Sequence, residues 1–190
     1  TDGQVRTLSY ENVRTDGEVD QAVEDAVRRG ANVIFTTTPK LLLSSVRQAA
    51  LHPDVKILNC SLNTSYPSVR TYYPRLYGAK FIKGAIAGTL TRDGCIGYVA
   101  DYPTYGSIAS INAFAQGARM VNANARIYLD WAHLRDGGAV GRLQAQGIVY
   151  IDYLDRLAAS TGTQMGNRHN LALIQTHWGR LYQSLVRRVM

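Results

Sequence analysis

The stretch that decides the fold is GEVDQAVEDAVRRGANVIFTTTPKLLLSSVRQAALHPDVKILN, residues 17–59. Residues 17–30 carry apolar side chains at helical spacing, and Gly30 ends the predicted helix after two arginines, which suit the negative end of a helix dipole. Residues 32–37 (NVIFTT) predict a short buried strand, a second helix begins near Pro39, and residues 55–59 (VKILN) predict the next strand. This alternation is typical of a parallel sheet covered by helices.

The same pattern extends along the rest of the chain and starts again near Asp93-Gly94. Further strands are predicted at residues 4–13, 68–73, 95–100, 125–131, 148–152 and 170–175. Helices are predicted at residues 75–90, 107–122, 139–146 and from about 178 onward, and residues 155–166 as a loop or short helix. The fold class is therefore α/β, with two Rossmann-like three-layer lobes and parallel sheets. We expect lobe one at 1–92, lobe two at 93–169, and a crossing strand and helix at 170–190.

The predicted helix at 75–90 is the longest apolar one. Its spacing predicts a core-facing set made of Leu76, Tyr77, Phe81, Ile82, Ala85, Ile86 and Leu90. Gly84 and Gly88, four residues apart, predict a face where another backbone approaches closely. In a membrane this spacing would suggest helix dimerisation, but the charged Lys80 and Lys83 on the same helix favour packing within a protein that is not in a membrane.

Composition excludes several classes of protein. The chain has 190 residues, 46% of them hydrophobic and 18% charged, which is ordinary for a folded domain. The net charge is +7, but no basic run exceeds two residues and no aromatic side chains are interleaved with a basic stripe, so nucleic-acid binding is not expected. No stretch approaches the roughly 18 apolar residues of a membrane helix. Cys60 and Cys95 have no disulfide or zinc spacing and are expected to be buried free thiols.

Motifs for catalysis are missing from the sequence. It contains no GxSxG, no GxxxxGK[ST] and no GxGxxG at a strand-to-helix junction. The four histidines lie in unrelated contexts, and the nearest pair, His169 and His177, is separated by a whole predicted strand. We therefore expect no enzyme activity, no metal and no cofactor.

Polar and aromatic residues gather instead at the carboxyl ends of the predicted strands, where open α/β sheets bind ligands. They suit a planar polar ligand, held by aromatic faces and by amide or carboxylate hydrogen bonds. Each also has a purely structural explanation, since aromatic residues pack in cores, Asp caps helices, and Thr-Thr-Pro forms a turn. The candidate ligand-binding residues are Thr36, Thr37, Asn59, Asn63, Asp101, Tyr102, Tyr105, Asp152, Tyr153, His177 and Trp178.

Three segments resemble the basic membrane protein (BMP) family of substrate-binding proteins. They are RTYYPRLYGAKFIKGAIAGTLTRDGCIGYVADYP at 70–103, INAFAQGARMVNANARIYLDW at 111–131 and THWGRLYQSLVRRV at 176–189. The resemblance implies a type I periplasmic-binding fold whose two lobes close on a nucleoside-like small molecule. It implies an ABC transporter permease as partner and an extracytoplasmic, lipid-anchored protein. It also implies that the first strand and helix of the family precede Thr1, so that the chain is a fragment.

The resemblance further implies roles for particular positions. Arg75–Thr91 would be the last helix of lobe one, and Cys95 would open lobe two. Asp101 would lie at the hinge-side end of the first strand of lobe two, and Asp152 at a strand end that lines the pocket. His177 and Trp178 would lie in a region that supplies a polar or basic contact. A different function stays open, in which the same module senses a ligand within a cytoplasmic regulatory protein.

Overall fold

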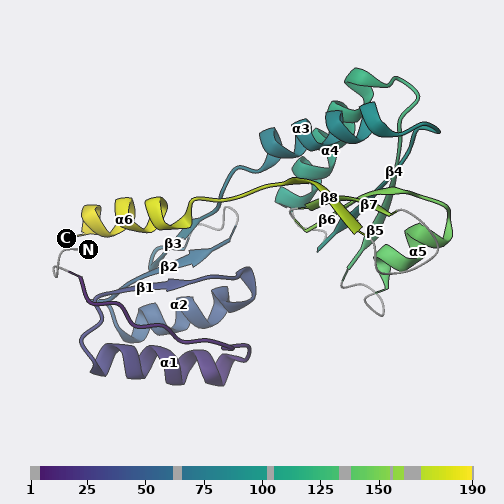
Figure 1. Cartoon of the computed structure of the whole chain (residues 1–190). Coiled ribbons are helices and arrows are strands. Elements are labelled where there is room, and N and C mark those ends of the chain that lie inside the picture. Colours follow the sequence, from purple (N-terminus) through teal and green to yellow (C-terminus); the bar gives the residue numbers. More distant parts are fainter. Residues whose placement is uncertain are drawn as a thin grey trace. The chain divides into compact units, whose positions relative to one another are not determined.

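The computed structural model describes residues 5–61, 66–101, 105–132, 138–154, 156–160 and 168–189 (Figure 1). The chain divides into two compact units. Unit one comprises Thr1–Pro74 and His177–Met190, and unit two comprises Arg75–Thr176. These units differ from the predicted lobes, whose boundary stood near residue 92.

Unit one is built on a three-stranded parallel sheet in the order β1-β2-β3. The strands are β1 (Val33–Thr36), β2 (Lys56–Cys60) and β3 (Val69–Tyr72). In the register of the sheet, Ile34 lies opposite Ile57, and Ile57 lies opposite Val69. The central strand β2 is buried from Ile57 to Cys60, because helices cover both of its faces.

Helices cover the two faces of this sheet separately (Figure 1). On one face lie α1 (Asp16–Arg28), the short helix η1 (Pro39–Leu41) and α2 (Leu42–Leu51). Val19 and Val23 of α1 pack there with Leu41, Ile57 and Val69. On the other face lies α6 (Trp178–Val189), whose apolar side contacts Leu58, Cys60 and Tyr72. A segment from the far end of the sequence therefore completes unit one.

Unit two contains a five-stranded sheet in the order β5-β4-β6-β7-β8. The strands are β4 (Cys95–Ala100), β5 (Arg126–Trp131), β6 (Tyr150–Tyr153), β7 (Arg156–Ser160) and β8 (Arg168–Leu173). The helices are α3 (Tyr77–Leu90), α4 (Tyr105–Val121) and α5 (Ala139–Ala145). Alternate residues of β4 pack in opposite directions, with Ile96 and Tyr98 in the cluster that holds Phe114 of α4, and Val99 in the cluster that holds Leu143 of α5.

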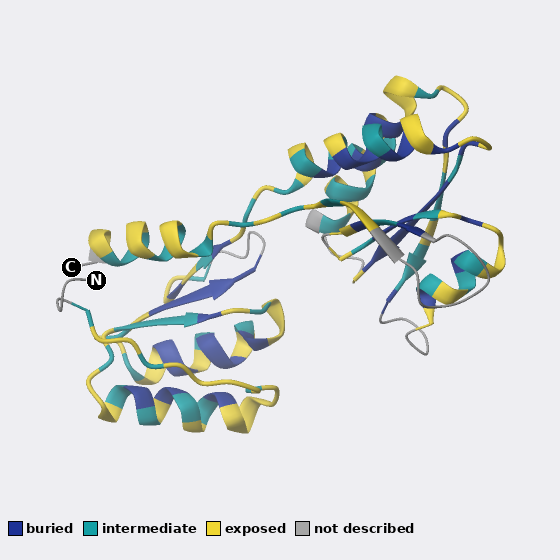
Figure 2. Cartoon of the chain, in the orientation of Figure 1, coloured by how far each residue is buried: buried dark blue, intermediate teal, exposed yellow. Residues whose placement is uncertain are grey.

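Helices α3 and α4 pack backbone against backbone. A Cβ atom added at Gly84 would overlap the carbonyl group of Phe114, and one at Gly117 would overlap that of Phe81. Figure 2 shows the buried stripe that this contact creates on both helices. The predicted small-residue face is thus a contact between two helices of the same unit.

The fold class is α/β as predicted, but three details of the prediction are wrong. Residues 5–13, the described part of the first predicted strand, form no strand, because no described strand pairs with them. Residues 156–160, predicted as a loop or short helix, form β7. This strand and β8 run antiparallel to their neighbours, so the sheet of unit two is mixed rather than parallel.

The core-facing side of α3 also differs from the prediction. Tyr77, Ile82 and Leu90 are exposed. The buried residues are Lys80, Lys83, Gly84, Ala87 and Gly88, which recur every three or four positions and form one helical stripe. The stripe holds glycines where the backbone of α4 leaves no room for a side chain, and its two lysines pair with Asp152 of unit two.

The two cysteines are unpaired, Cys60 buried and Cys95 half-buried. Within the described residues, no helix has both the length and the apolar character that crossing a bilayer requires.

Candidate functional site

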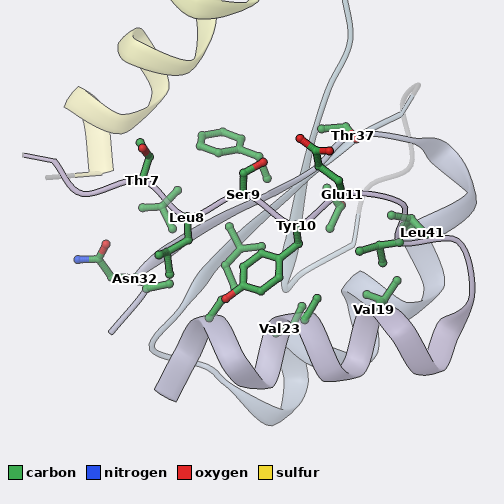
Figure 3. Close-up of a pocket in the computed structure, with 18 of the residues that line it drawn as sticks. Thr7, Leu8, Ser9, Tyr10, Glu11, Val19, Val23, Asn32, Thr37 and Leu41 are labelled. Carbon is green, nitrogen blue, oxygen red and sulfur yellow. The ribbon is translucent and has the colours of Figure 1, made fainter. Parts of the chain in front are cut away.

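A cavity of about 830 Å³ lies in unit one between β1 and the N-terminal segment, residues 5–13. We call it the β1 cavity. Residues 5–13 line one side and residues 30–38, which include all of β1, line the other. In Figure 3, Val19 and Val23 rise from α1 toward the segment that carries Leu8 and Tyr10. The size is within the range of small-molecule pockets.

At one end of the β1 cavity lie Thr36 and Thr37, where β1 ends. Asn59 at the end of β2 donates from Nδ2 to Thr36 Oγ1 (2.7 Å) and to the Thr38 carbonyl oxygen (3.0 Å). Ser45 donates to the Leu41 carbonyl oxygen (2.7 Å), and its Oγ lies 2.9 Å from Thr36 Oγ1, which is also 3.4 Å from the Leu58 carbonyl oxygen. The result is a connected group of hydrogen bonds at the carboxyl edge of the sheet.

Thr36 and Asn59, both predicted site residues, are thus brought into contact, and both are buried. Because both hydrogens of the Asn59 amide nitrogen are used, its orientation is fixed and Oδ1 points the other way. Asn59 is 0% exposed, and its Oδ1 has no hydrogen-bond partner among the described residues. The same is true of Ser61 Oγ. Within the described part of the chain, the end of β2 therefore carries two polar atoms without a hydrogen-bond partner. The predicted site residue Asn63 lies outside the described residues.

Trp178, a predicted ligand-stacking residue, lies in an aromatic cluster of unit one. Its ring is stacked on Tyr182 (centroids 5.9 Å apart, planes at 21°) and meets Tyr72 edge to face (6.1 Å, 81°). Tyr72 and Tyr182 are joined through their hydroxyl groups (3.2 Å). The pKa of Tyr72 is raised, mainly by burial and to a smaller extent by the hydrogen bond to Tyr182. The cluster attaches α6 to the sheet, whereas the neighbouring His177 is exposed.

Asp152, another predicted site residue, lies on β6 of unit two and is 0% exposed. Its carboxylate is ion-paired with both Lys80 (Nζ–Oδ2 2.9 Å) and Lys83 of α3. Lys80 also donates to the Leu154 carbonyl oxygen (2.8 Å) and lies 5.3 Å from the centre of the Tyr98 ring. This arrangement fixes the end of β6 against α3.

The two lysines outnumber their single carboxylate inside the protein. Lys83 is 2% exposed, and burial is the main reason that its pKa falls to about 8, although the charge of Asp152 opposes the fall. Apolar periodicity did not identify these lysines, because it assigns only apolar residues to the buried side of α3. Their spacing of three, in register with Gly84 and Ala87, was the signal that could have identified them.

The other predicted residues of unit two lie along the chain at or after the ends of β4 and β6. Tyr153 is half-buried at the end of β6, and Asp101 is exposed directly after β4. Tyr105 begins α4, and Tyr102 lies outside the described residues. At the end of β5, Asp130 accepts two hydrogen bonds from Arg142 (2.8 and 3.0 Å), which joins β5 to α5.

Within the described residues there is no group of three or more His, Cys, Asp or Glu that could hold a metal ion. The polar atoms that lie near the strand ends can donate and accept hydrogen bonds, and the aromatic rings can stack. Such an arrangement can bind a small polar molecule.

The comparisons with known proteins agree with this picture. The sequence is 26% identical over 162 residues to a purine-binding protein of Brucella abortus, a match that covers 82% of this chain and 46% of that protein. It is 27% identical over 124 residues to a candidate ABC transporter glucose-binding protein of Haloferax volcanii, covering 65% of this chain and 32% of that protein.

The fold is similar to that of a transcriptional activator of the comK gene from Bacillus halodurans. The TM-score is 0.58 at 15% sequence identity, over 75% of this chain and 50% of the other. The chain therefore spans about half the length or less of these proteins.

A family model described as "ABC transporter substrate-binding protein PnrA-like" (Bmp) matches residues 1–162. This match confirms the resemblance seen in the sequence, and the family that it describes is one of substrate-binding proteins rather than enzymes, as predicted. The chain belongs to the Bmp family of PnrA-like ABC transporter substrate-binding proteins.

Proposed function

We propose that the protein binds a purine nucleoside or a closely related molecule and delivers it to an ABC importer. The observation that carries the proposal is the family match over residues 1–162. The similarity to a purine-binding protein supports the class of ligand. In this proposal the protein acts outside the cytoplasmic membrane, attached through a lipid, and a permease is its partner.

The residues at the strand ends supply the chemistry that such a ligand needs. A purine offers ring nitrogens and exocyclic groups, and its ribose offers hydroxyl groups. Asn59 Oδ1 is an acceptor with no partner among the described residues, and Thr37 is exposed beside the β1 cavity. Asp101, Tyr102, Tyr105, Tyr153 and His177 stay proposed contacts. Thr36, Asp152 and Trp178 are proposed to hold the site in shape through the contacts described above.

A thermal-shift assay with guanosine, adenosine, inosine, uridine and glucose tests the proposal. A ligand present at about 100 times its dissociation constant should stabilise the protein by roughly 2.7 kcal/mol. We expect the purine nucleosides to raise the unfolding temperature, and uridine and glucose to leave it unchanged. A shift with glucose alone, or with no compound in the set, would refute the proposed ligand class.

Replacing Thr37 by Val locates the binding region in the same assay. The substitution keeps the shape of the side chain and removes its hydroxyl group, so we expect the nucleoside to bind about fivefold more weakly. Thr89→Val is the matched control, because Thr89 lies on α3 and donates to the Ala85 carbonyl oxygen within its own helix. Equal affinities for the two variants would exclude Thr37 from the site.

A further inference from the structure

Strand β5 lies at the edge of the five-stranded sheet of unit two, and among the described residues no strand pairs with its outer side. The N–H groups of Arg126 and Ala132 donate to carbonyl oxygens beside the two ends of β4 (2.8 Å each). Successive residues of a strand direct their backbone groups to alternate edges. The backbone groups of the even-numbered residues of β5 therefore face β4, and those of Ile127 and Leu129 face outward.

The outward row is already used at both of its ends. The N–H of Ala125 donates to the Asn122 carbonyl oxygen (2.9 Å). The N–H of Trp131 donates to Asp130 Oδ1 (2.7 Å). Between these two ends, the backbone groups of the other two outward-facing residues have no hydrogen-bond partner within the part of the chain that the structure describes. The open part of the edge is therefore short and has defined limits.

The side chains of β5 are complementary to those of a second copy. The strand reads RIYLDW, so Arg126 and Asp130 lie two positions before and two positions after Tyr128. When two copies pair antiparallel about Tyr128, the exposed Arg126 lies directly opposite Asp130 of the second copy. Arg142 holds that carboxylate in place at the end of β5. A parallel pairing in register would instead place like charges beside each other, which is unfavourable.

The pairing about Tyr128 is also the one that uses both open residues. Ile127 lies opposite Leu129 of the second copy, and such a pair exchanges both of its backbone hydrogen bonds. A pairing centred on either of these residues would need Ala125 or Trp131, whose N–H groups are already bonded. The register about Tyr128 further brings two apolar side chains together, since Leu129 is 42% exposed and Ile127 lies on the same face of the sheet.

We propose that β5 forms the interface of a symmetric dimer, in which two copies of the chain pair their β5 strands antiparallel about Tyr128. Because each copy uses the same surface, the contact closes after two copies, and the exposed edge of β5 is then covered in both. The contact is small, so the dimer is expected to dissociate on dilution. The inference does not depend on the identity of the solute.

Hydrogen exchange of the whole chain, followed by NMR at several protein concentrations, tests the pairing at single amides. We expect the amides of Ile127 and Leu129 to exchange rapidly in dilute protein and to become protected as the concentration rises to about 1 mM. The amide of Tyr128 faces β4 and should be protected throughout. Protection of Ile127 and Leu129 that is independent of concentration, or no protection at about 1 mM, would refute the proposal.

A matched pair of variants tests the outward donor. Leu129→Pro removes an N–H that faces away from β4, whereas Leu129→Ala keeps this N–H and also shortens the side chain. The dimer uses the donor in both copies, so we expect its dissociation constant to be at least about tenfold larger for Leu129→Pro than for Leu129→Ala. Sedimentation equilibrium measures the two constants, and equal values would overturn the proposal.

Disulfide trapping tests the register without relying on a proline variant. Arg126 and Asp130 of the second copy form a pair without backbone hydrogen bonds, with Cα atoms about 4.5 Å apart, which a disulfide can span. Arg126→Cys is mixed with Asp130→Cys under mild oxidation, and both variants carry Cys95→Ser because Cys95 lies opposite Arg126 in β4. We expect the mixture to cross-link. Each variant alone should not, since its two introduced thiols are about 13 Å out of register.

Two results of the trapping experiment would overturn the proposal. One is the absence of cross-linking in the mixture, which would show that any dimer forms through another surface. The other is cross-linking of either single variant as fast as that of the mixture, which would show that the contact has no fixed register. Binding of guanosine, measured by thermal shift, tests the proposed solute separately, because no residue of β5 is among the proposed solute contacts.

Discussion

At the scale of single residues, the Lys80–Asp152–Lys83 group places three ionisable side chains in the interior of unit two. Its charges are withdrawn from water, and an ion pair in such surroundings gains little over an apolar contact of the same shape. Removing one partner is a different matter, because the charge left behind stays buried. The loss in the free energy of unfolding should therefore depend strongly on which of the three residues is replaced.

Asp152→Asn leaves two buried ammonium groups facing a neutral amide. We expect it to lower the free energy of unfolding by about 3–5 kcal/mol. Lys83→Met leaves the Lys80–Asp152 pair complete and should cost less than about 1 kcal/mol. Urea denaturation of the two variants checks this order, and equal losses would contradict it.

Lys83 also gives the stability a defined dependence on pH. Its pKa is about 8 in the folded protein against an ordinary value of 10.5, so between these values the unfolded chain binds more protons. The free energy of unfolding therefore rises with pH across this window, and the destabilising contribution is fully present below pH 8. Subtracting the pH profile of Lys83→Met from that of the natural protein isolates the effect. A difference that stays flat from pH 8 to 10 would show that Lys83 does not titrate there.

At the scale of secondary structure, the contact between α3 and α4 depends on glycine. Gly84→Ala places a methyl group against the carbonyl of Phe114, and we expect a loss of about 3 kcal/mol or more. Gly78 lies on the same helix with open space around it, so Gly78→Ala should stabilise the protein by up to about 1 kcal/mol. Thermal unfolding of the two variants should shift in opposite directions, and a similar shift for both would mean that the contact is looser than described.

Helices and strands could be predicted from the sequence where the spacing of apolar residues determines them. They could not be predicted where contacts with residues far away in the chain determine the conformation or the burial. The helix at α3 and its small-residue contact were predictable, but its buried lysines were not, because their burial depends on Asp152 sixty-nine or more positions away in the chain. The strand β7 was missed since its short sequence, RLAAS, gains its strand conformation from pairing with β6 and β8. In the candidate site, the contact between Thr36 and Asn59 follows from adjacent parallel strands, whereas the role of Trp178 in the aromatic cluster requires knowledge that α6 returns to unit one.

At the scale of the whole molecule, the two units have separate cores. Val23 belongs to the core of unit one, and Phe114 and Ala118 to that of unit two. We therefore expect Val23→Ala to speed amide exchange mainly in unit one and Gly84→Ala mainly in unit two. Exchange measured by mass spectrometry on both variants checks the assignment. Faster exchange throughout the chain in either variant would show that the units unfold together.

The attachment of α6 to the first sheet has a consequence for biosynthesis. The ribosome makes Leu58, Cys60 and Tyr72 early, yet the helix that covers them is assembled from Trp178 onward. At 5–20 residues per second, this apolar face waits on the order of ten seconds for its cover, while every part of unit two is already made. The nascent protein is thus expected to finish its second unit before its first, and to need protection by chaperones on that one face in the meantime.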